Sequence, residues 1–121
     1  AINGGEYAVI GSTMGTHIID VSNPTQSYEA AFVPGAQQYS VTHRDFFHMD
    51  HYLYGVCDQG ASTLQIIDIS NLPNSVNVVY DSDSLIATSH NMFIDTLNKK
   101  LYSTNGDVLD ISNPTSPSFL F

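Results

Sequence analysis

The chain has 121 residues, 42% of them hydrophobic and 12% charged, so it is long enough for one packed domain and too apolar for a disordered tail. Three basic residues stand against twelve acidic ones, and the formal net charge of −9 argues strongly against binding to nucleic acid or to an anionic membrane. No stretch approaches the ~20 apolar residues of a membrane span. The apolar residues are rich in Val, Ile, Tyr and Phe, and the polar ones in Ser, Asn, Thr and Asp, so strands joined by turns are expected. We therefore predict an all-β fold.

Nearly the same phrase occurs three times, as HIIDVSNP from residue 17, QIIDISNLP from residue 65 and VLDISNP from residue 108. Its aspartates, Asp20, Asp68 and Asp110, are 48 and 42 residues apart. Two further series have the same period, namely tyrosines at Tyr7, Tyr54 and Tyr102 and histidines at His43 and His90. A period of 42–48 residues with four short apolar runs is typical of the four-stranded antiparallel blade of a β-propeller.

The predicted elements run through three units in chain order. Residues 1–35 are a partial blade with strands two to four, because nothing before GGEYAVIG resembles an inner strand. Residues 36–83 are a complete blade, and its strands are expected near 41–47, 52–57, 64–69 and 76–81. Residues 84–121 are nearly complete and break off at SPSFLF, where the outer strand begins. These two and a half blades do not close a ring, so we expect a fragment of a larger propeller whose open faces meet the remaining blades or other chains.

The repeated phrase predicts both a buried strand and a turn. Two adjacent aliphatic positions precede each aspartate, at Ile18, Ile66 and Val108 and at Ile19, Ile67 and Leu109. Neighbouring strand residues face opposite sides of a sheet, so such a strand is covered on both faces. The three aspartates are expected to be structural, because their carboxylates can accept the N–H two residues on and so hold the turn before Asn-Pro.

The phrase, with YAVIGSTMGTHIIDVSNP and ATSHNMFIDTLNKKLYS, resembles the LVIVD-repeat proteins, and among them the secreted bacterial choice-of-anchor B group. The resemblance covers essentially the whole chain. It implies a β-propeller of an exported protein at the bacterial cell surface or released from it. Inner strands of such repeats often open with His followed by Asn or Asp, which His90-Asn91 matches and His43-Arg44-Asp45 matches only loosely.

Two groups of residues are candidates for chemistry. His43 and His90, with Asp45 and Asn91, open the expected inner strands, which line the channel of a propeller, and could contact a ligand or simply tie the strand to the next blade. A possible metal set lies in HRDFFHMDH and comprises His43, His48, Asp50 and His51. Zn²⁺ suits the imidazoles, and Ca²⁺ suits carboxylates such as those of DSDS at 81–84. The alternative for both segments is a solvated turn or loop.

These features favour a non-enzymatic scaffold that binds a protein, a glycan or a cation. The alternative is a metal-dependent enzyme whose channel site is built from the inner-strand histidines. Nucleophile motifs are weak, because GSTMG has threonine rather than serine at its centre. Cys57 lies in the apolar run YLYGVC and is expected to be a buried thiol.

Overall fold

In the computed structural model, which describes residues 1–60 and 62–121, the chain forms three antiparallel sheets in sequence order, with a single 3-10 turn at Pro24–Gln26. The first sheet contains β1 (Tyr7–Gly11), β2 (Gly15–Asp20) and β3 (Tyr28–Pro34). The second contains β4 (His43–Met49), β5 (Tyr52–Asp58), β6 (Leu64–Asp68) and β7 (Asn77–Ser82). The third contains β8 (Met92–Asp95), β9 (Lys100–Ser103), β10 (Val108–Asp110) and β11 (Ser118–Phe119).

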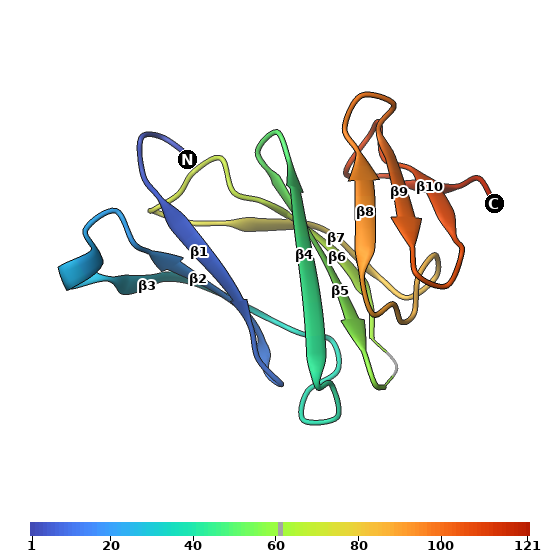
Figure 1. The fold of residues 1–121 in the computed structure, drawn as a ribbon, viewed down its shortest axis with the longest axis horizontal. Coiled ribbons are helices and arrows are strands. Elements are labelled where there is room, and N and C mark those ends of the chain that lie inside the picture. The colour runs from blue at the N-terminus through green and yellow to red at the C-terminus, as the bar shows by residue number, and fades with distance from the viewer. Residues whose placement is uncertain (61) are drawn as a thin grey trace.

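The three sheets stand side by side, as Figure 1 shows, and each strand pairs with its neighbour in the chain. β4 of the second sheet and β8 of the third lie next to each other along one side. This arrangement confirms the predicted all-β class and the partial propeller blades. We call the three sheets the first, second and third blades, and the contacts between them the first and second junctions.

Each junction is filled by an apolar cluster, and the middle blade contributes to both. At the first junction Ile18 packs with Leu53 and Ile67, all at most 3% exposed. At the second, Ile66 and Leu109 are fully buried in the other cluster. Ile66 and Ile67 are neighbours that face opposite blades, so the aliphatic pair of the middle strand is covered on both faces.

The two outermost faces are open, and the same sequence positions are exposed there. Ile19 and Val108, which correspond to Ile67 and Ile66, are only half-buried. Ile10 of the first blade is 54% exposed, and Phe93 of the third is 60% exposed. The pattern of burial therefore follows from whether a neighbouring blade is present.

The strand register corrects two of the sequence alignments. Tyr7 pairs with Asp20, whereas Asp68 pairs with Tyr52, so the counterpart of Tyr7 is Tyr52 and not Tyr54. Tyr54 and Tyr102 are true counterparts, because they pair with the equivalent residues Ile66 and Val108, so only the spacing from Tyr7 to Tyr54 was a coincidence. Loops of different length between the strands explain why Tyr7 and Tyr54 are not equivalent. An insertion in a loop changes the number of a strand residue but not its position in the sheet.

The same effect separates His43 from His90. Leu53 and Leu101 are counterparts, since each pairs with the residue before its turn aspartate. Their partners on the inner strands are His48 and Ile94, which lie 46 residues apart. Counting back along β4 and β8 makes Arg44 the counterpart of His90. His43 and His90 therefore do not occupy equivalent places in their blades.

The strand-ending aspartates hold their turns in the same way three times. The carboxylate Oδ1 of Asp20, Asp68 and Asp110 accepts the backbone N–H of Ser22, Ser70 and Ser112 at 2.9, 2.9 and 2.8 Å. Hydrogen bonds from the following serine lower the pKa of all three carboxyls. Hydrogen bonding to the charged form thus favours the ionised carboxylate and the turn together.

Candidate functional site

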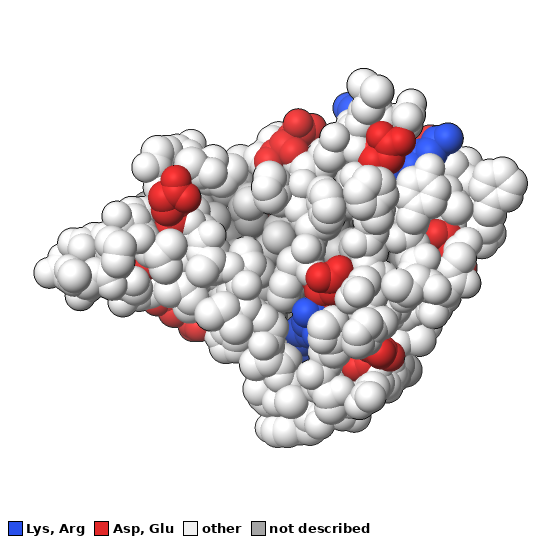
Figure 2. All heavy atoms as spheres, viewed as in Figure 1, with Lys and Arg blue, Asp and Glu red and all other residues white. Residues whose placement is uncertain are grey.

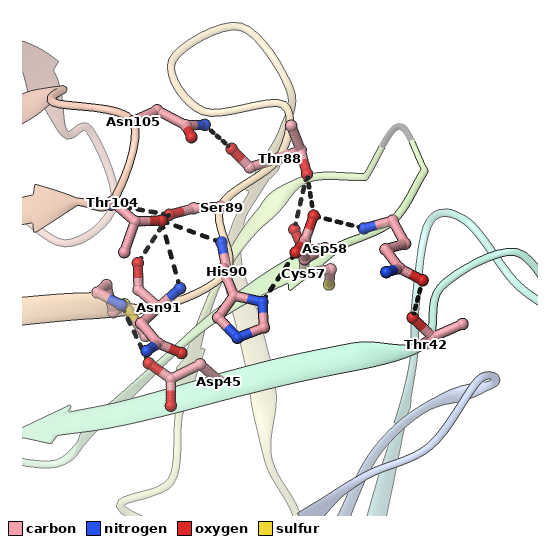
Figure 3. Close-up of polar contacts among 12 residues, drawn as sticks. Thr42, Asp45, Cys57, Asp58, Thr88, Ser89, His90, Asn91, Thr104 and Asn105 are labelled. Carbon is pink, nitrogen blue, oxygen red and sulfur yellow. Dashed lines mark hydrogen bonds and ion pairs between the residues drawn. The ribbon is translucent and has the colours of Figure 1, made fainter.

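Polar side chains gather at the second junction, where β4 begins and the segment before β8 crosses it (Figure 3). His43 and His90 lie face to face, with ring centroids 4.1 Å apart and planes 12° from parallel. The Nδ1 atom of His90 lies 2.8 Å from Oδ2 of Asp58 at the end of β5. The His90 side chain remains 57% exposed. The two rings thus meet between the second and third blades, because His43 faces the third blade and His90 faces the second.

The two histidines differ in how their nitrogens are satisfied. His90 has a carboxylate partner, whereas Nε2 of His43 is buried and has no hydrogen-bond partner among the described residues. A buried imidazole nitrogen without a partner is unfavourable unless another group supplies the bond. This atom is the clearest unsatisfied polar group among the predicted site residues.

Asp45 and Asn91 have different places in this arrangement. Oδ2 of Asp45 accepts the backbone N–H of Met92 at 3.0 Å, so this carboxylate joins β4 to β8. Asn91 is exposed next to the junction, and its backbone carbonyl accepts the hydroxyl of Ser89 at 2.7 Å. The four predicted ligand residues do come together, but Asp45 is already engaged in the junction.

Backbone bonds to β5 hold the segment before β8 in place. The Ser89 N–H and the Thr88 hydroxyl both donate to the carbonyl oxygen of Cys57, at 2.8 and 3.1 Å. The carboxylate of Asp58, one residue on, accepts the Gln59 N–H at 2.6 Å. This backbone bond, followed by the bond to His90, lowers the pKa of Asp58. The junction therefore carries a carboxylate that is held ionised beside an imidazole.

The first junction is tied by a different residue. The guanidinium of Arg44, the counterpart of His90, reaches back to the first blade and donates to the carbonyl oxygen of Ser12 at 2.7 Å. It also donates to the carbonyl oxygen of Gln37, in the connection between β3 and β4, at 3.2 Å. Its Nη1 also lies 2.8 Å from Sγ of Cys57, a buried thiol as the sequence predicted. A side chain at Gly11 or Gly35 would collide with Arg44, so both glycines make room for it.

Gln65 adds a second link at the first junction. Its side chain is only 3% exposed, and its Nε2 donates to the Pro34 carbonyl oxygen and to Oδ2 of Asp81, both at 3.0 Å. Asp81 also accepts the Thr63 hydroxyl at 2.7 Å. This carboxylate of the DSDS segment is therefore bonded to its own blade.

The structure does not bring the predicted metal set together. His43 and His48 lie near opposite ends of β4, and Asp50 and His51 form the exposed turn beyond it. His51 packs against Tyr52, with ring centroids 4.3 Å apart. Within residues 1–60 and 62–121, no three His, Cys, Asp or Glu side chains are grouped so that they could hold one metal ion.

Arg44 and Asp58 make the principal cross-blade bonds, and neither was among the site residues predicted from the sequence. Arg44 could have been noticed, because it is one of only three basic residues and stands inside a predicted strand. No local pattern distinguishes Asp58 from the other aspartates near turns. Its role depends on the loop before β8, which brings His90 within reach.

Acidic side chains are scattered over the face shown in Figure 2, and few basic ones accompany them.

No helix in the described part of the chain is long and apolar enough to cross a membrane.

Packed antiparallel sheets with repeated turns and shared apolar junctions define a β-propeller-like repeat protein. The LVIVD repeat family model matches residues 3–32, 50–79 and 105–121, which is more than half of the chain. The chain belongs to this family. The matched segments cover β1, β2 and most of β3 in the first blade, β5, β6 and the start of β7 in the second, and β10 and β11 in the third. They leave out β4, β8 and β9. No curated protein and no solved structure matches the chain.

Proposed function

We propose that the chain is part of a non-enzymatic, exported repeat scaffold that binds a protein, a glycan or a cation at the bacterial cell surface. One observation carries this proposal, namely that the side chains best suited to chemistry already bond one blade to the next. Arg44 holds a carbonyl oxygen of the first blade, Asp45 holds an amide of the third, and Asp58 holds His90. Groups committed in this way stabilise an architecture.

We place the proposed binding surface at the start of the inner strands β4 and β8, around His43, His90 and Asn91. His90 and Asn91 are exposed there, and His43 retains an unused nitrogen. Export and surface location follow from the resemblance to the choice-of-anchor B group. The high acidic content is compatible with a cation or a positively charged protein as the ligand.

Titration calorimetry of the purified 121-residue chain with CaCl₂ and with ZnCl₂, together with a glycan array, tests the binding role. Because the proposed surface includes both imidazoles, His43→Ala and His90→Ala are each expected to weaken binding while the stoichiometry stays unchanged. Fractionation of the source cells tests export, and recovery of the protein only from the cytosol would contradict it.

A metal-dependent enzyme is the second candidate, and the unpartnered Nε2 of His43 beside His90 and Asp58 favours it. The three groups belong to one junction, and further ligands would have to come from another chain or blade. Metal analysis of the native protein decides between the two. Stoichiometric zinc, copper or iron that is lost in the His43→Ala, His90→Ala double variant would replace the scaffold proposal.

A further inference from the structure

The free edge of β1 presents unpaired backbone groups. In the hairpin, Val21 N–H donates to the Glu6 carbonyl oxygen and Ser12 N–H to that of Gly15, both at 2.9 Å. Bonds alternate along an antiparallel ladder, so Tyr7, Val9 and Gly11 direct their N–H and C=O groups away from β2. In the described chain no other strand pairs with this edge. The equivalent edges of β5 and β9 pair with β4 and β8.

A hollow runs beside this edge, between the first and second blades. It has a volume of about 320 Å³ and is lined by Val9, Asp45, Phe46, Phe47, His48 and Leu53. A second hollow of about 170 Å³ shares Val9, His48 and Leu53 with it and continues toward residues 1–7. Figure 2 shows the surface hollowed between the lobe at the left and the middle of the molecule. An unpaired strand edge thus borders a largely apolar cleft.

In the second blade, β4 occupies the edge of β5 that corresponds to the open edge of β1. β4 pairs with β5 through Asp45 opposite Val56 and Phe47 opposite Tyr54. The Phe47 ring packs on the buried cluster and lies edge-on to Phe93, with centroids 6.0 Å apart. The Asp45 carboxylate accepts the N–H of Met92 in the next inner strand. The aromatic ring and the carboxylate, two residues apart, both face the following blade.

The inner strands share this pattern. By strand register, Asn91 is the counterpart of Asp45 and Phe93 of Phe47, so both strands read Asp or Asn, any residue, then Phe. On β1, Val9 and Gly11 are the counterparts of Tyr54 and Val56. A strand antiparallel to β1 would therefore place its Phe opposite Val9 and its acidic residue opposite Gly11.

The N–H that such a carboxylate would reach has no acceptor among the described residues. His51 O accepts the Ile69 N–H, so alternation directs Tyr52, Tyr54 and Val56 toward β4. Their partners include Phe47 and Asp45, which leaves the N–H of Phe46 pointing away from β5. Phe46 is the counterpart of Met92, whose N–H takes the Asp45 carboxylate at the second junction.

We propose that the edge of β1 and the adjoining hollow form a binding site for an extended segment that carries an acidic residue two positions before a phenylalanine. The segment adds to the first blade as a fourth strand, by β-augmentation. Its carboxylate accepts the Phe46 N–H, and its phenyl ring fills the hollow beside Val9 and Leu53. This site goes beyond the proposed function and depends neither on export nor on the histidine pair.

A fluorescein-labelled peptide with the sequence of residues 42–50, THRDFFHMD, tests the site against the full chain. Fluorescence anisotropy is expected to show saturable binding. The D45A peptide is expected to bind about tenfold more weakly, because a charge-assisted hydrogen bond is lost. The F47A peptide and a peptide N-methylated at the residue opposite Val9 are expected to lose binding, while a scrambled peptide of the same composition serves as control.

Hydrogen exchange of the ¹⁵N-labelled chain locates the bound peptide. The amides of Tyr7, Val9, Gly11 and Phe46 are expected to gain protection, and Phe46 is expected to lose that gain with the D45A peptide. Equal binding of the scrambled peptide would overturn the proposal, as would no binding at millimolar peptide. Protection at β3 or β11 instead of β1, or displacement of β4 from β5, would overturn it as well.

Discussion

The two junctions between blades have the same apolar design and different polar connections. At the first, the always-charged Arg44 bonds backbone carbonyl oxygens and lies over two glycines. At the second, Asp45 accepts a backbone amide and the ionisable pair Asp58 and His90 spans the gap. The apolar packing therefore defines how blades associate, and the inner-strand polar residue of each unit determines how they are tied. Acid sensitivity of the ties is expected at the second junction only.

Truncation of the central aliphatic pair is expected to have the largest effect. Ile66→Ala and Ile67→Ala each remove a fully buried side chain from one junction, and each should lower the free energy of unfolding by roughly 2–5 kcal/mol. Ile19→Ala and Val108→Ala, at the outward-facing counterparts, are expected to lose less than half as much. Urea denaturation followed by circular dichroism measures all four. Equal losses at inward and outward positions would contradict the two-sided packing of the middle blade.

Arg44→Ala is expected to be next, with a loss of about 2–3 kcal/mol. The substitution leaves the Ser12 and Gln37 carbonyl oxygens without their donor and opens space over Gly11 and Gly35. Arg44→Lys should recover only part of the loss, because an ammonium group cannot reproduce the fork of donors. Thr96→Ala, an exposed loop position, is the matched control and should change stability by no more than about 0.5 kcal/mol.

Asp45→Ala is expected to lower stability by roughly 1–3 kcal/mol, because the Met92 N–H loses its acceptor. Asp45→Asn keeps an acceptor oxygen and should lose less. Hydrogen exchange of the Met92 amide provides a direct measurement, and faster exchange in Asp45→Ala alone is expected. Unchanged protection of this amide would show that the carboxylate does not tie β4 to β8.

The smallest expected effect is a change in the acid dependence of stability at Asp58. Its folded pKa is depressed, first by the Gln59 N–H and then by His90, so its stabilisation is present above about pH 4 and is lost as pH falls through the folded value. Asp58→Asn should therefore be less stable than the wild type at pH 7, and the difference should narrow at pH 3. Urea midpoints at the two pH values measure this.

Asp83→Asn, an exposed carboxyl in the loop after β7, is the control for that comparison. It should keep the same offset from the wild type at both pH values. An Asp58→Asn variant that behaves like this control would mean that the pair with His90 does not stabilise the second junction.

The repeated phrase predicted the third strand of each unit and the turn that follows it, because the residues of the phrase themselves favour that strand and that turn. Ile66 and Ile67 are both apolar, which only a strand covered on two faces tolerates, and Asp68 carries a carboxylate that reaches the N–H of Ser70. Such local patterns require no knowledge of the neighbours. The inner strand predicted near 41–47 is observed at His43–Met49, two residues further along the chain.

Only the tertiary structure decided which side chains meet. The turn joining β4 to β5 is two residues shorter than the one joining β8 to β9, so equal sequence spacing placed His43 and His90 at non-equivalent positions. The two rings stack because His43 faces the third blade and His90 faces the second. The position on β4 that is equivalent to His90 is held by Arg44, which faces the first blade. Which side chains meet between blades depends on the register of every strand and on the length of every loop. These quantities cannot be read from a single sequence.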